Sequence, residues 1–334
     1  MKFLKSLAFS TVLMASLAGT QAQATECGTK DKITIAEMTW LSASSLAQMA
    51  KIILTKGYGC DVEVIPGDTV PTATSMLTKN EPDIAPELWV STAAAIWQKT
   101  QEKGNIYKAA NVFADGGQEG WWVPDYVMKE HPEIKTINDL AANAKVFAEP
   151  ENPEKGRFYG CPPGWACEMI INNMFKAMKL DTTFELFSPG SGENLKASIA
   201  RKVSKKQAFV GYYWAPTDVI GKYHLVRLGM PEFDKAKFAC LSDAKCANPQ
   251  LSGWAVGEVA VAATTSLRDK APPVAEFLSK FTLPNDSVNK VLAWGDDNKA
   301  KPEEVAMQYL KTEEAVWTKW VPADVAEKVK ASLK

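Results

Sequence analysis

Residues 33–67 read ITIAEMTWLSASSLAQMAKIILTKGYGCDVEVIPG and contain one strand–helix–strand unit. The first and last segments are short runs rich in isoleucine and valine, which favour β-strands. The middle segment places Leu46, Met49 and Ile53 on one face of a helix, and Gly57 ends that helix. Because two strands joined by a helix lie parallel in one sheet, this stretch predicts an α/β fold.

The same alternation of strands and helices occurs twice along the chain. A second α/β series begins at GWWVPDYV (120–127) and continues to QAFVGYYW (207–214), and the last third is mostly helical. About 310 residues remain after the N-terminal segment, and single cores usually stop growing near 250–300 residues. We therefore expect two lobes joined by crossover strands, with parallel-rich sheets and a hinged cleft between them. Lobe I comprises residues 25–119 and 224–334, and lobe II comprises residues 120–223.

Residues 1–24 have the pattern of a secretory signal peptide. Two lysines precede an apolar run at 7–17, and Ala22-Gln23-Ala24 is a small-x-small cleavage signature. A membrane anchor is the competing interpretation, but a spanning helix needs about 20 apolar residues. We predict cleavage after Ala24 and a periplasmic protein. Cleavage removes two of the 38 basic residues and none of the 39 acidic ones, which leaves a net charge of −3. That balance argues against a nucleic-acid partner.

The chain contains six cysteines, and in an exported protein they indicate disulfides. Two pairs, Cys161–Cys167 and Cys240–Cys246, would each close a short local loop. The remaining pair, Cys27–Cys60, precedes two expected strands that start side by side if they are neighbours in a parallel sheet. A metal site is the alternative. Because the chain has only two histidines, His131 and His224, we predict no metal and no cofactor.

Several of the 11 tryptophans fall at the ends of expected strands. These are Trp40, Trp89 and Trp214, and the pair Trp121–Trp122 lies at the expected crossover between the lobes. Packing in the core is the ordinary explanation for a tryptophan, but it does not favour strand ends. Ligands of open α/β sheets bind at the carboxyl ends of strands. A ring of aromatic faces there suits a quaternary ammonium group, which cation–π attraction holds without hydrogen bonds.

Trp165 lies in the loop GCPPGWACE (160–168), between two cysteines and after two prolines. A disulfide and the prolines would fix this ring as a rigid wall and reduce the ordering cost of binding. A helix follows the loop, so the amides of Ala166 and Cys167 could bind an anionic group. The alternative is a loop that only staples the fold.

At these residues the chain resembles the ProX-type, OpuAC-like glycine betaine-binding proteins, which are periplasmic components of ABC importers. GCPPGWACE, GYYWAPTDV and ELWVS carry the resemblance. It implies a monomeric type II periplasmic binding protein that delivers its ligand to permease and ATPase subunits. It further implies a cage of Trp89, Trp165 and Trp214, with backbone groups at 165–167 meeting a ligand carboxylate. Trp40 is similar to a further cage member of the choline and betaine binders. We expect Trp122 to contribute another wall, with its neighbour Trp121 as the alternative.

Two departures from the family pattern bear on the ligand. Ala93 stands where the family has a histidine that helps to hold the carboxylate, and Ala166 stands where it has glycine. The missing histidine weakens the case for glycine betaine in particular, and a site with fewer anion partners would suit trimethylamine N-oxide or a cation such as choline. Three carboxylates flank the tryptophans, and they would either offset a cation or serve as solvated or capping groups; they are Glu37, Glu87 and Glu119.

Three other function classes are weaker. The chain lacks the Gly-x-Ser-x-Gly and His-Glu-x-x-His motifs of hydrolases, and we predict that it is not an enzyme. A sugar or amino-acid binder would need polar side chains between the tryptophans, whereas PELWV and GYYWAP are mostly apolar or aromatic.

Overall fold

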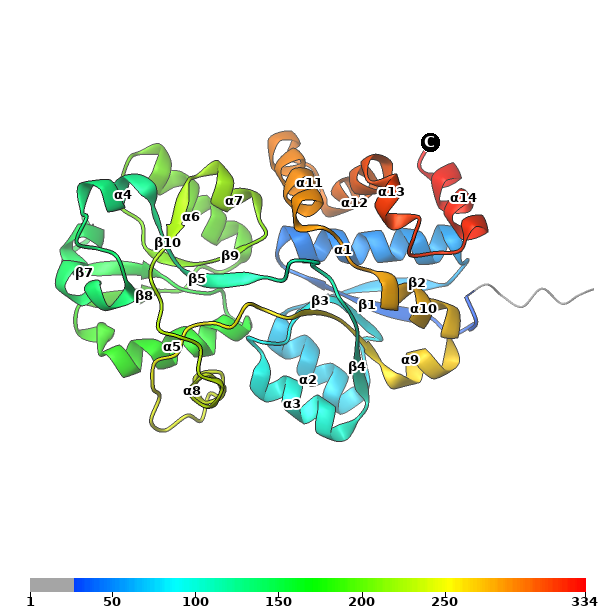
Figure 1. Cartoon of the computed structure of the whole chain (residues 1–334), viewed down its shortest axis with the longest axis horizontal. Coiled ribbons are helices and arrows are strands. Elements are labelled where there is room, and N and C mark those ends of the chain that lie inside the picture. The colour runs from blue at the N-terminus through cyan, green and yellow to red at the C-terminus, as the bar shows by residue number, and fades with distance from the viewer. Residues whose placement is uncertain (1–26) are drawn as a thin grey trace, which may run out of the picture.

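The computed structural model describes residues 27–334, so the predicted signal peptide lies outside the described residues. Two lobes form, each around its own β-sheet, and two extended segments connect them (Figure 1). The predicted two-lobed α/β fold is confirmed. Within residues 27–334, no helix combines the length and the apolar character needed to cross a bilayer.

The first lobe has a five-stranded sheet in the order β2-β1-β3-β11-β4. Its strands are β1 (Ile33–Met38), β2 (Val62–Gly67), β3 (Ile84–Trp89), β4 (Ile106–Asn111) and β11 (Val259–Thr264). Its helices are α1 (Leu41–Ile52), which continues as the π-helix η1 (Ile53–Gly57), α2 (Thr69–Lys79), α3 (Ala94–Lys103), α9 (Thr265–Lys270) and α10 (Pro272–Lys280). Strand β1 runs parallel to β2 and β3, as the strand–helix alternation predicts.

Four helices follow α10 and cover α1 on the outside of this lobe (Figure 1). They are α11 (Asn285–Asn298), α12 (Pro302–Thr312), α13 (Glu314–Trp317) and α14 (Ala323–Ser332). Helix α11 also reaches the second lobe, where it contacts α7 (Asp218–Lys222).

The second lobe has a six-stranded sheet in the order β10-β5-β9-β7-β6, with β8 paired to β7. Its strands are β5 (Gln118–Pro124), β6 (Ala148–Glu149), β7 (Asn152–Tyr159), β8 (Phe184–Phe187), β9 (Gly211–Ala215) and β10 (Leu225–Arg227). Besides α7, its helices are α4 (Asp125–Glu130), α5 (Ala166–Met178), α6 (Gly192–Ser204), α8 (Lys235–Leu241) and the 3₁₀ turns η2 (Ile137–Asp139), η3 (Ala141–Phe147) and η4 (Leu180–Thr182).

Both sheets are mixed rather than predominantly parallel. Of the strand pairs in residues 27–334, four are parallel and five are antiparallel. Strands β5 and β11 account for most of the antiparallel pairs, because each lies beside a connecting segment and enters its sheet from the other lobe. The strand–helix–strand units predict the parallel pairs only.

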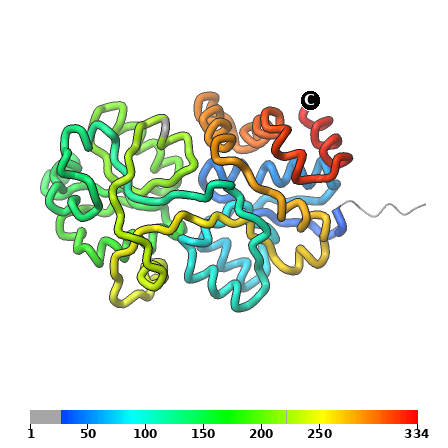
Figure 2. The backbone as a smooth tube through the Cα atoms, viewed as in Figure 1, coloured from blue at the N-terminus to red at the C-terminus, as the bar shows by residue number. Residues whose placement is uncertain are grey.

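The chain returns to the first lobe later than the predicted boundary at residue 224. Strand β10 pairs with β5 in the second sheet, and α8 packs against α5. The return is instead at the point where Gly257 and Gly117 exchange backbone hydrogen bonds of 2.7 and 3.0 Å. Figure 2 shows the two connecting segments crossing side by side between the lobes. The antiparallel pairing of β10 holds residues 225–227 in the second lobe.

All three predicted disulfides are present, and they are Cys27–Cys60, Cys161–Cys167 and Cys240–Cys246. The first joins the starts of two neighbouring parallel strands, because Ile33 of β1 is in register with Val62 of β2. The other two each link residues six positions apart.

Candidate functional site

A small cavity of about 270 Å³ lies between the lobes, and aromatic rings form most of its wall. Its lining residues are Trp40, Thr69, Trp89, Glu119, Trp165, Ala166, Cys167, Tyr212 and Trp214. The first three belong to the first lobe and the rest to the second. The cavity is thus completed only when the lobes are together.

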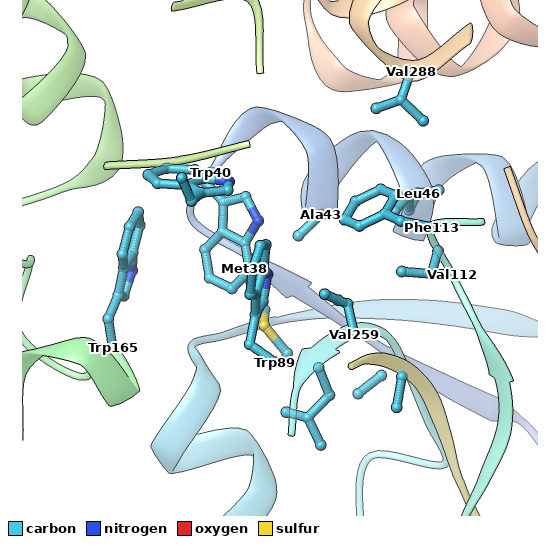
Figure 3. Packing of buried hydrophobic residues seen from close by; sticks show 14 of the residues in the cluster. Met38, Trp40, Ala43, Leu46, Trp89, Val112, Phe113, Trp165, Val259 and Val288 are labelled. Atoms are coloured by element: carbon cyan, nitrogen blue, oxygen red, sulfur yellow. The ribbon is translucent and has the colours of Figure 1, made fainter. Parts of the chain in front are cut away.

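The four tryptophans of the cavity lie close to one another and are almost fully buried. Trp165 occupies the middle, with its ring centroid 5.0 Å from that of Trp40 and 5.1 Å from that of Trp214. Both pairs meet edge to face, at interplanar angles of 69° and 79°. Trp40 and Trp89 approach from the first lobe, opposite Trp165 (Figure 3). Perpendicular rings present both edges and faces to the enclosed space, so a ligand group there meets π-faces from several directions.

The backbone explains why these rings converge. Trp40 follows β1 and is the residue before α1, and Trp89 is the last residue of β3. Since β1 and β3 are parallel neighbours, their carboxyl ends lie at the same edge of the sheet. In β9, Tyr212 and Trp214 are two positions apart, so both side chains point to the same face.

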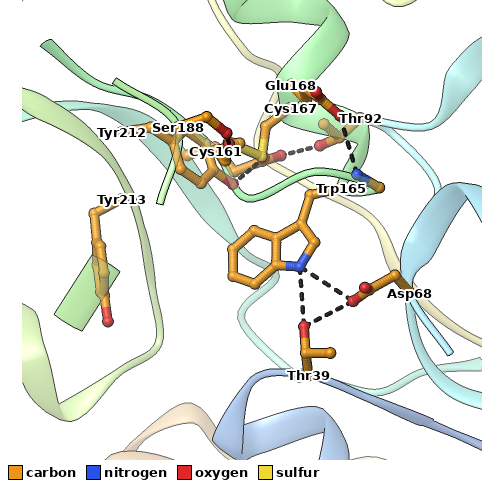
Figure 4. Close-up of a disulfide and its surroundings, with 12 residues drawn as sticks. Thr39, Asp68, Thr92, Cys161, Trp165, Cys167, Glu168, Ser188, Tyr212 and Tyr213 are labelled. Carbon is orange, nitrogen blue, oxygen red and sulfur yellow. Dashed lines mark hydrogen bonds between the residues drawn. A yellow bond between two sulfur atoms is a disulfide. The ribbon is translucent and has the colours of Figure 1, made fainter. Parts of the chain in front are cut away.

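The loop that carries Trp165 is tied to both lobes. The disulfide Cys161–Cys167 closes it, and the Glu168 carboxylate accepts a hydrogen bond from the Gly164 amide at 3.0 Å. The indole Nε1–H of Trp165 faces Thr39 Oγ1 and Asp68 Oδ1 of the first lobe, each at 3.2 Å (Figure 4). These contacts fix the ring as a wall and fasten the second lobe to the first.

Helix α5 begins at Ala166, directly after Trp165. Ala166 and Cys167 both line the cavity, and the first four amides of a helix have no partner within the helix. The helix dipole adds partial positive charge at this end. The wall next to Trp165 therefore suits a negatively charged or strongly polar ligand atom.

One buried carboxylate holds two of the cage tryptophans. Glu87 Oε1 accepts hydrogen bonds from Trp40 Nε1 at 2.6 Å, from Trp89 Nε1 at 3.0 Å and from Ser42 Oγ at 3.1 Å. Glu87 is fully buried. Burial raises the pKa of its carboxyl group to about 7, although the hydrogen bonds from Trp40, Trp89 and Ser42 oppose that shift. Glu87 lies behind the rings and does not line the cavity.

A second buried carboxylate, Glu119, lines the cavity itself. It accepts a hydrogen bond from the Tyr212 hydroxyl at 2.6 Å and another from the Thr92 hydroxyl. Burial raises its pKa to about 7 as well, against the effect of both hydrogen bonds. Glu119 can therefore hold a proton near neutral pH, and it can act as a hydrogen-bond donor or as a negative charge.

Two predicted residues lie elsewhere. Trp122 does not line the cavity, and its Nε1–H donates to the Tyr213 carbonyl at 2.9 Å. Its neighbour Trp121 is in the core of the second lobe, with 4.5 Å between its ring centroid and that of Phe158. Glu37 accepts hydrogen bonds from Gln48 on α1 rather than from a cavity residue.

The replaced histidine position lies outside the cavity, whereas two unpredicted residues line it. Ala93 is buried just before α3 and does not line the cavity. Tyr212 and Thr69 do line it, although the sequence analysis missed both. The two-residue spacing of Tyr212 and Trp214 could have revealed the tyrosine, but no signal marked Thr69. Across residues 27–334, no cluster of three histidine, cysteine or acidic side chains could hold a metal ion.

Residues 31–312 match the family model described as the substrate binding domain of ABC-type glycine betaine transport systems, OpuAC. The chain belongs to the OpuAC family. This family is made up of substrate-binding transport proteins rather than enzymes, and the match confirms the resemblance seen at the tryptophan segments.

Two OpuAC-family relatives are named as glycine betaine/proline betaine-binding periplasmic proteins. The one from Salmonella typhimurium is 28% identical over 192 residues, covering 55% of this chain and 57% of the relative. The one from Escherichia coli is 25% identical over 235 residues, covering 65% and 70%. The chain thus spans little more than half the length of the Salmonella typhimurium relative.

Solved structures support the fold. A choline-binding protein of an ABC transporter, in complex with choline, superposes with a TM-score of 0.72 at 19% identity, covering 92% of this chain and 99% of the other. Lactococcal OpuAC in its closed form with glycine betaine gives a TM-score of 0.67 at 17% identity, covering 87% and 100%. At this identity the likeness establishes the type II binding-protein fold.

Proposed function

We propose that this OpuAC-family chain is the periplasmic solute-binding protein of an ABC importer for a small trimethylammonium osmolyte. The ligand is glycine betaine or trimethylamine N-oxide, and the tryptophan cage holds its methylated nitrogen by cation–π contacts. The observation that carries this proposal is the convergence of Trp40, Trp89, Trp165 and Trp214 on one small cavity. The names of the relatives support both the ligand class and the periplasmic location.

The energetics are sufficient for useful affinity. Each ring contributes about 0.5–2 kcal/mol to a desolvated cation. Four rings together with burial of the methyl groups reach the roughly −8 kcal/mol that corresponds to micromolar binding. Binding in a cavity made from two lobes also favours closure, and the closed form is the state that the permease and ATPase subunits would engage.

The polar part of the cavity distinguishes among the ligands. The α5 amides suit the carboxylate of glycine betaine, whereas an ionised Glu119 would repel it. A protonated Glu119 could donate a hydrogen bond to an N-oxide oxygen, and an ionised Glu119 could pair with choline. The small cavity and the absence of a histidine at Ala93 favour trimethylamine N-oxide over glycine betaine.

Choline or carnitine is the second candidate class, because two buried carboxylates, Glu87 and Glu119, lie at or behind the cage. A sugar ligand fits less well, since aromatic rings rather than hydrogen-bonding side chains make up most of the wall.

Calorimetric titration of residues 25–334 with glycine betaine, trimethylamine N-oxide and choline tests the proposal. We expect micromolar binding of one of them and its loss in Trp165→Ala. The matched control is Trp97→Ala on α3, which removes a tryptophan that does not line the cavity. Absence of binding by all three ligands, or equal effects of the two substitutions, would contradict the trimethylammonium cage.

A further inference from the structure

Carboxylates lie behind the aromatic cage and accept hydrogen bonds from its rings. The indole N–H groups of Trp40 and Trp89 donate to Glu87, and that of Trp165 donates to Asp68. A fifth ring also donates to a carboxylate, because the Tyr212 hydroxyl donates to Glu119, although Glu119 lines the cavity rather than lying behind it. Trp214 is the exception, since its Nε1 is buried without a hydrogen-bond partner among residues 27–334.

A hydrogen bond from a ring N–H to a carboxylate changes how the ring interacts with a cation. The bond polarises the indole and increases the negative potential on its face, and polarisation is stronger in a buried, low-dielectric setting. Cation–π attraction depends on that potential. The carboxylate also adds its own negative charge on the far side of the ring, where little solvent screens it.

Glu87 has the features of a charged group that lacks a counter-ion. Its Oε1 accepts three hydrogen bonds, all from neutral donors, and its Oε2 is buried without a hydrogen-bond partner within residues 27–334. The three donors on Oε1 favour the ionised form, although burial opposes it, and at a pH above its pKa of about 7 Glu87 is a buried anion. Burying such an anion is costly unless a positive charge approaches it. The cage of Trp40 and Trp89 is the place where a cation could approach.

We propose that Glu87 sets the preference of the cavity for a positively charged nitrogen, acting through Trp40 and Trp89 as a positioning and polarising residue. Asp68 accepts from Trp165 in the same way, but it is only partly buried, so its effect on that ring is weaker. This inference rests on the proposed function, because it concerns how the same cavity selects its ligand. It adds that the rings alone do not determine selectivity: the carboxylates behind them make the cavity reject a neutral group of the same shape.

The test compares each ammonium ligand with its carbon isostere, in which C replaces the N⁺. The pairs are choline with 3,3-dimethylbutan-1-ol, glycine betaine with 3,3-dimethylbutanoate, and trimethylamine N-oxide with tert-butanol. Affinities are measured at pH 8 for the mature wild-type protein and for Glu87→Gln, directly for ammonium ligands and by displacement for isosteres. Glutamine keeps a hydrogen-bond acceptor for the indoles but removes the charge.

We expect Glu87→Gln to weaken the ammonium ligand about tenfold, or about 1.4 kcal/mol, and to change the isostere less than twofold. We also expect the unliganded variant to unfold at a higher temperature, because an uncompensated buried charge is gone. Glu37→Gln is the matched control, since its carboxylate contacts Gln48 and should leave both affinities unchanged. Asp68→Asn provides a second test and should show a smaller selective loss, because Asp68 is partly exposed and solvent screens its charge.

Three outcomes would overturn the inference. If Glu87→Gln lost the same affinity for the ammonium ligand and for its isostere, Glu87 would have a role in ring geometry alone. Unchanged affinity of Glu87→Gln for the ammonium ligand would show that Glu87 has no effect on binding. A lower unfolding temperature together with equal losses of affinity for both ligands would show that Glu87 only supports the structure. If the wild-type protein binds none of the ammonium ligands, the proposed function fails, and that result is read before any variant is made.

Discussion

Asp296 on α11 of the first lobe forms an ion pair with Lys196 on α6 of the second, with 2.5 Å between its Oδ1 and the lysine Nζ. Lys196 also lies 3.0 Å from Asp218, and Lys222 pairs with the other oxygen of Asp296. Burial disfavours the charged form of Lys196, but the hydrogen bonds and charges of Asp296 and Asp218 outweigh it and raise its pKa. Helices from both lobes are therefore joined by charges as well as by the cage.

The first prediction concerns this interlobe ion pair. Asp296 is the first-lobe partner of Lys196 and Lys222, so Asp296→Asn breaks the interlobe ion pairs described above. The closed form becomes less favourable, and the ligand Kd should rise about three- to tenfold. The increase should shrink between ~50 mM and ~500 mM NaCl, because salt screens the pair in the wild-type protein. Calorimetry of the variant and the wild-type protein at both salt concentrations measures the increase in Kd. Glu276→Gln breaks an exposed pair within α10 and should have little effect. Wild-type affinity of Asp296→Asn at low salt would refute the prediction.

The second prediction compares two disulfides of equal spacing. Replacing Cys161 and Cys167 by serine should lower the free energy of unfolding by about 2 kcal/mol and weaken binding several-fold, because the Trp165 loop becomes mobile. Replacing Cys240 and Cys246 should cost similar stability but leave the affinity unchanged, since neither residue lines the cavity. Denaturant titration and calorimetry on both double variants provide the measurements. Equal affinity losses would show that the loop has no special role.

The third prediction concerns pH. Glu119 has a pKa of about 7 in the folded protein because of burial, against an ordinary value near 4.5 in the unfolded chain. Between these values the folded state binds more protons, so the free energy of unfolding should fall as pH rises from about 4.5 to about 7. The contribution of one such group is at most about 3 kcal/mol. Urea denaturation at pH 5 and pH 8 should show a smaller fall for Glu119→Gln than for the wild-type protein. Identical falls would contradict a raised pKa.

The fourth prediction separates two tryptophans of the second lobe. Trp214→Phe should weaken ligand binding about tenfold, because a smaller ring replaces one wall of the cavity. Trp122→Phe should leave the affinity within twofold and cost about 1 kcal/mol of stability through the lost hydrogen bond to Tyr213. Calorimetry and thermal unfolding of both variants test this. A tenfold affinity loss in Trp122→Phe would place its ring at the ligand after all.

The sequence predicts the cavity better than its polar surroundings. Trp40, Trp89 and Trp214 were found because carboxyl ends of neighbouring strands meet at one edge, which is a rule of topology. Trp121 and Trp122 are harder to place, because alternation sends their side chains to opposite faces of β5 without indicating whether either face borders the cavity, and neither ring lines it. The sequence predicts Glu87 as a carboxylate that flanks the tryptophans. Its contact with two indoles depends on how α1 packs against β3, and no local pattern encodes that packing.

The lobe boundary shows a similar limit. Strand–helix alternation predicts the parallel pairs of both sheets from local patterns. The three-residue strand β10 carries no comparable signal, because its membership of the second sheet comes from antiparallel pairing with β5, about a hundred residues earlier. The disulfides were easier to predict, since two are local and the third follows from parallel neighbours.

The cage is divided evenly between the lobes, with Trp40 and Trp89 on one and Trp165 and Trp214 on the other. Each lobe thus carries half of the cavity wall, and neither half encloses the cavity by itself. The halves are also separable along the chain, because residues 118–256 form one contiguous block between the two crossings. New ligand preferences could therefore arise in this family by exchange of a single block, which would replace two walls of the cage and retain the other two.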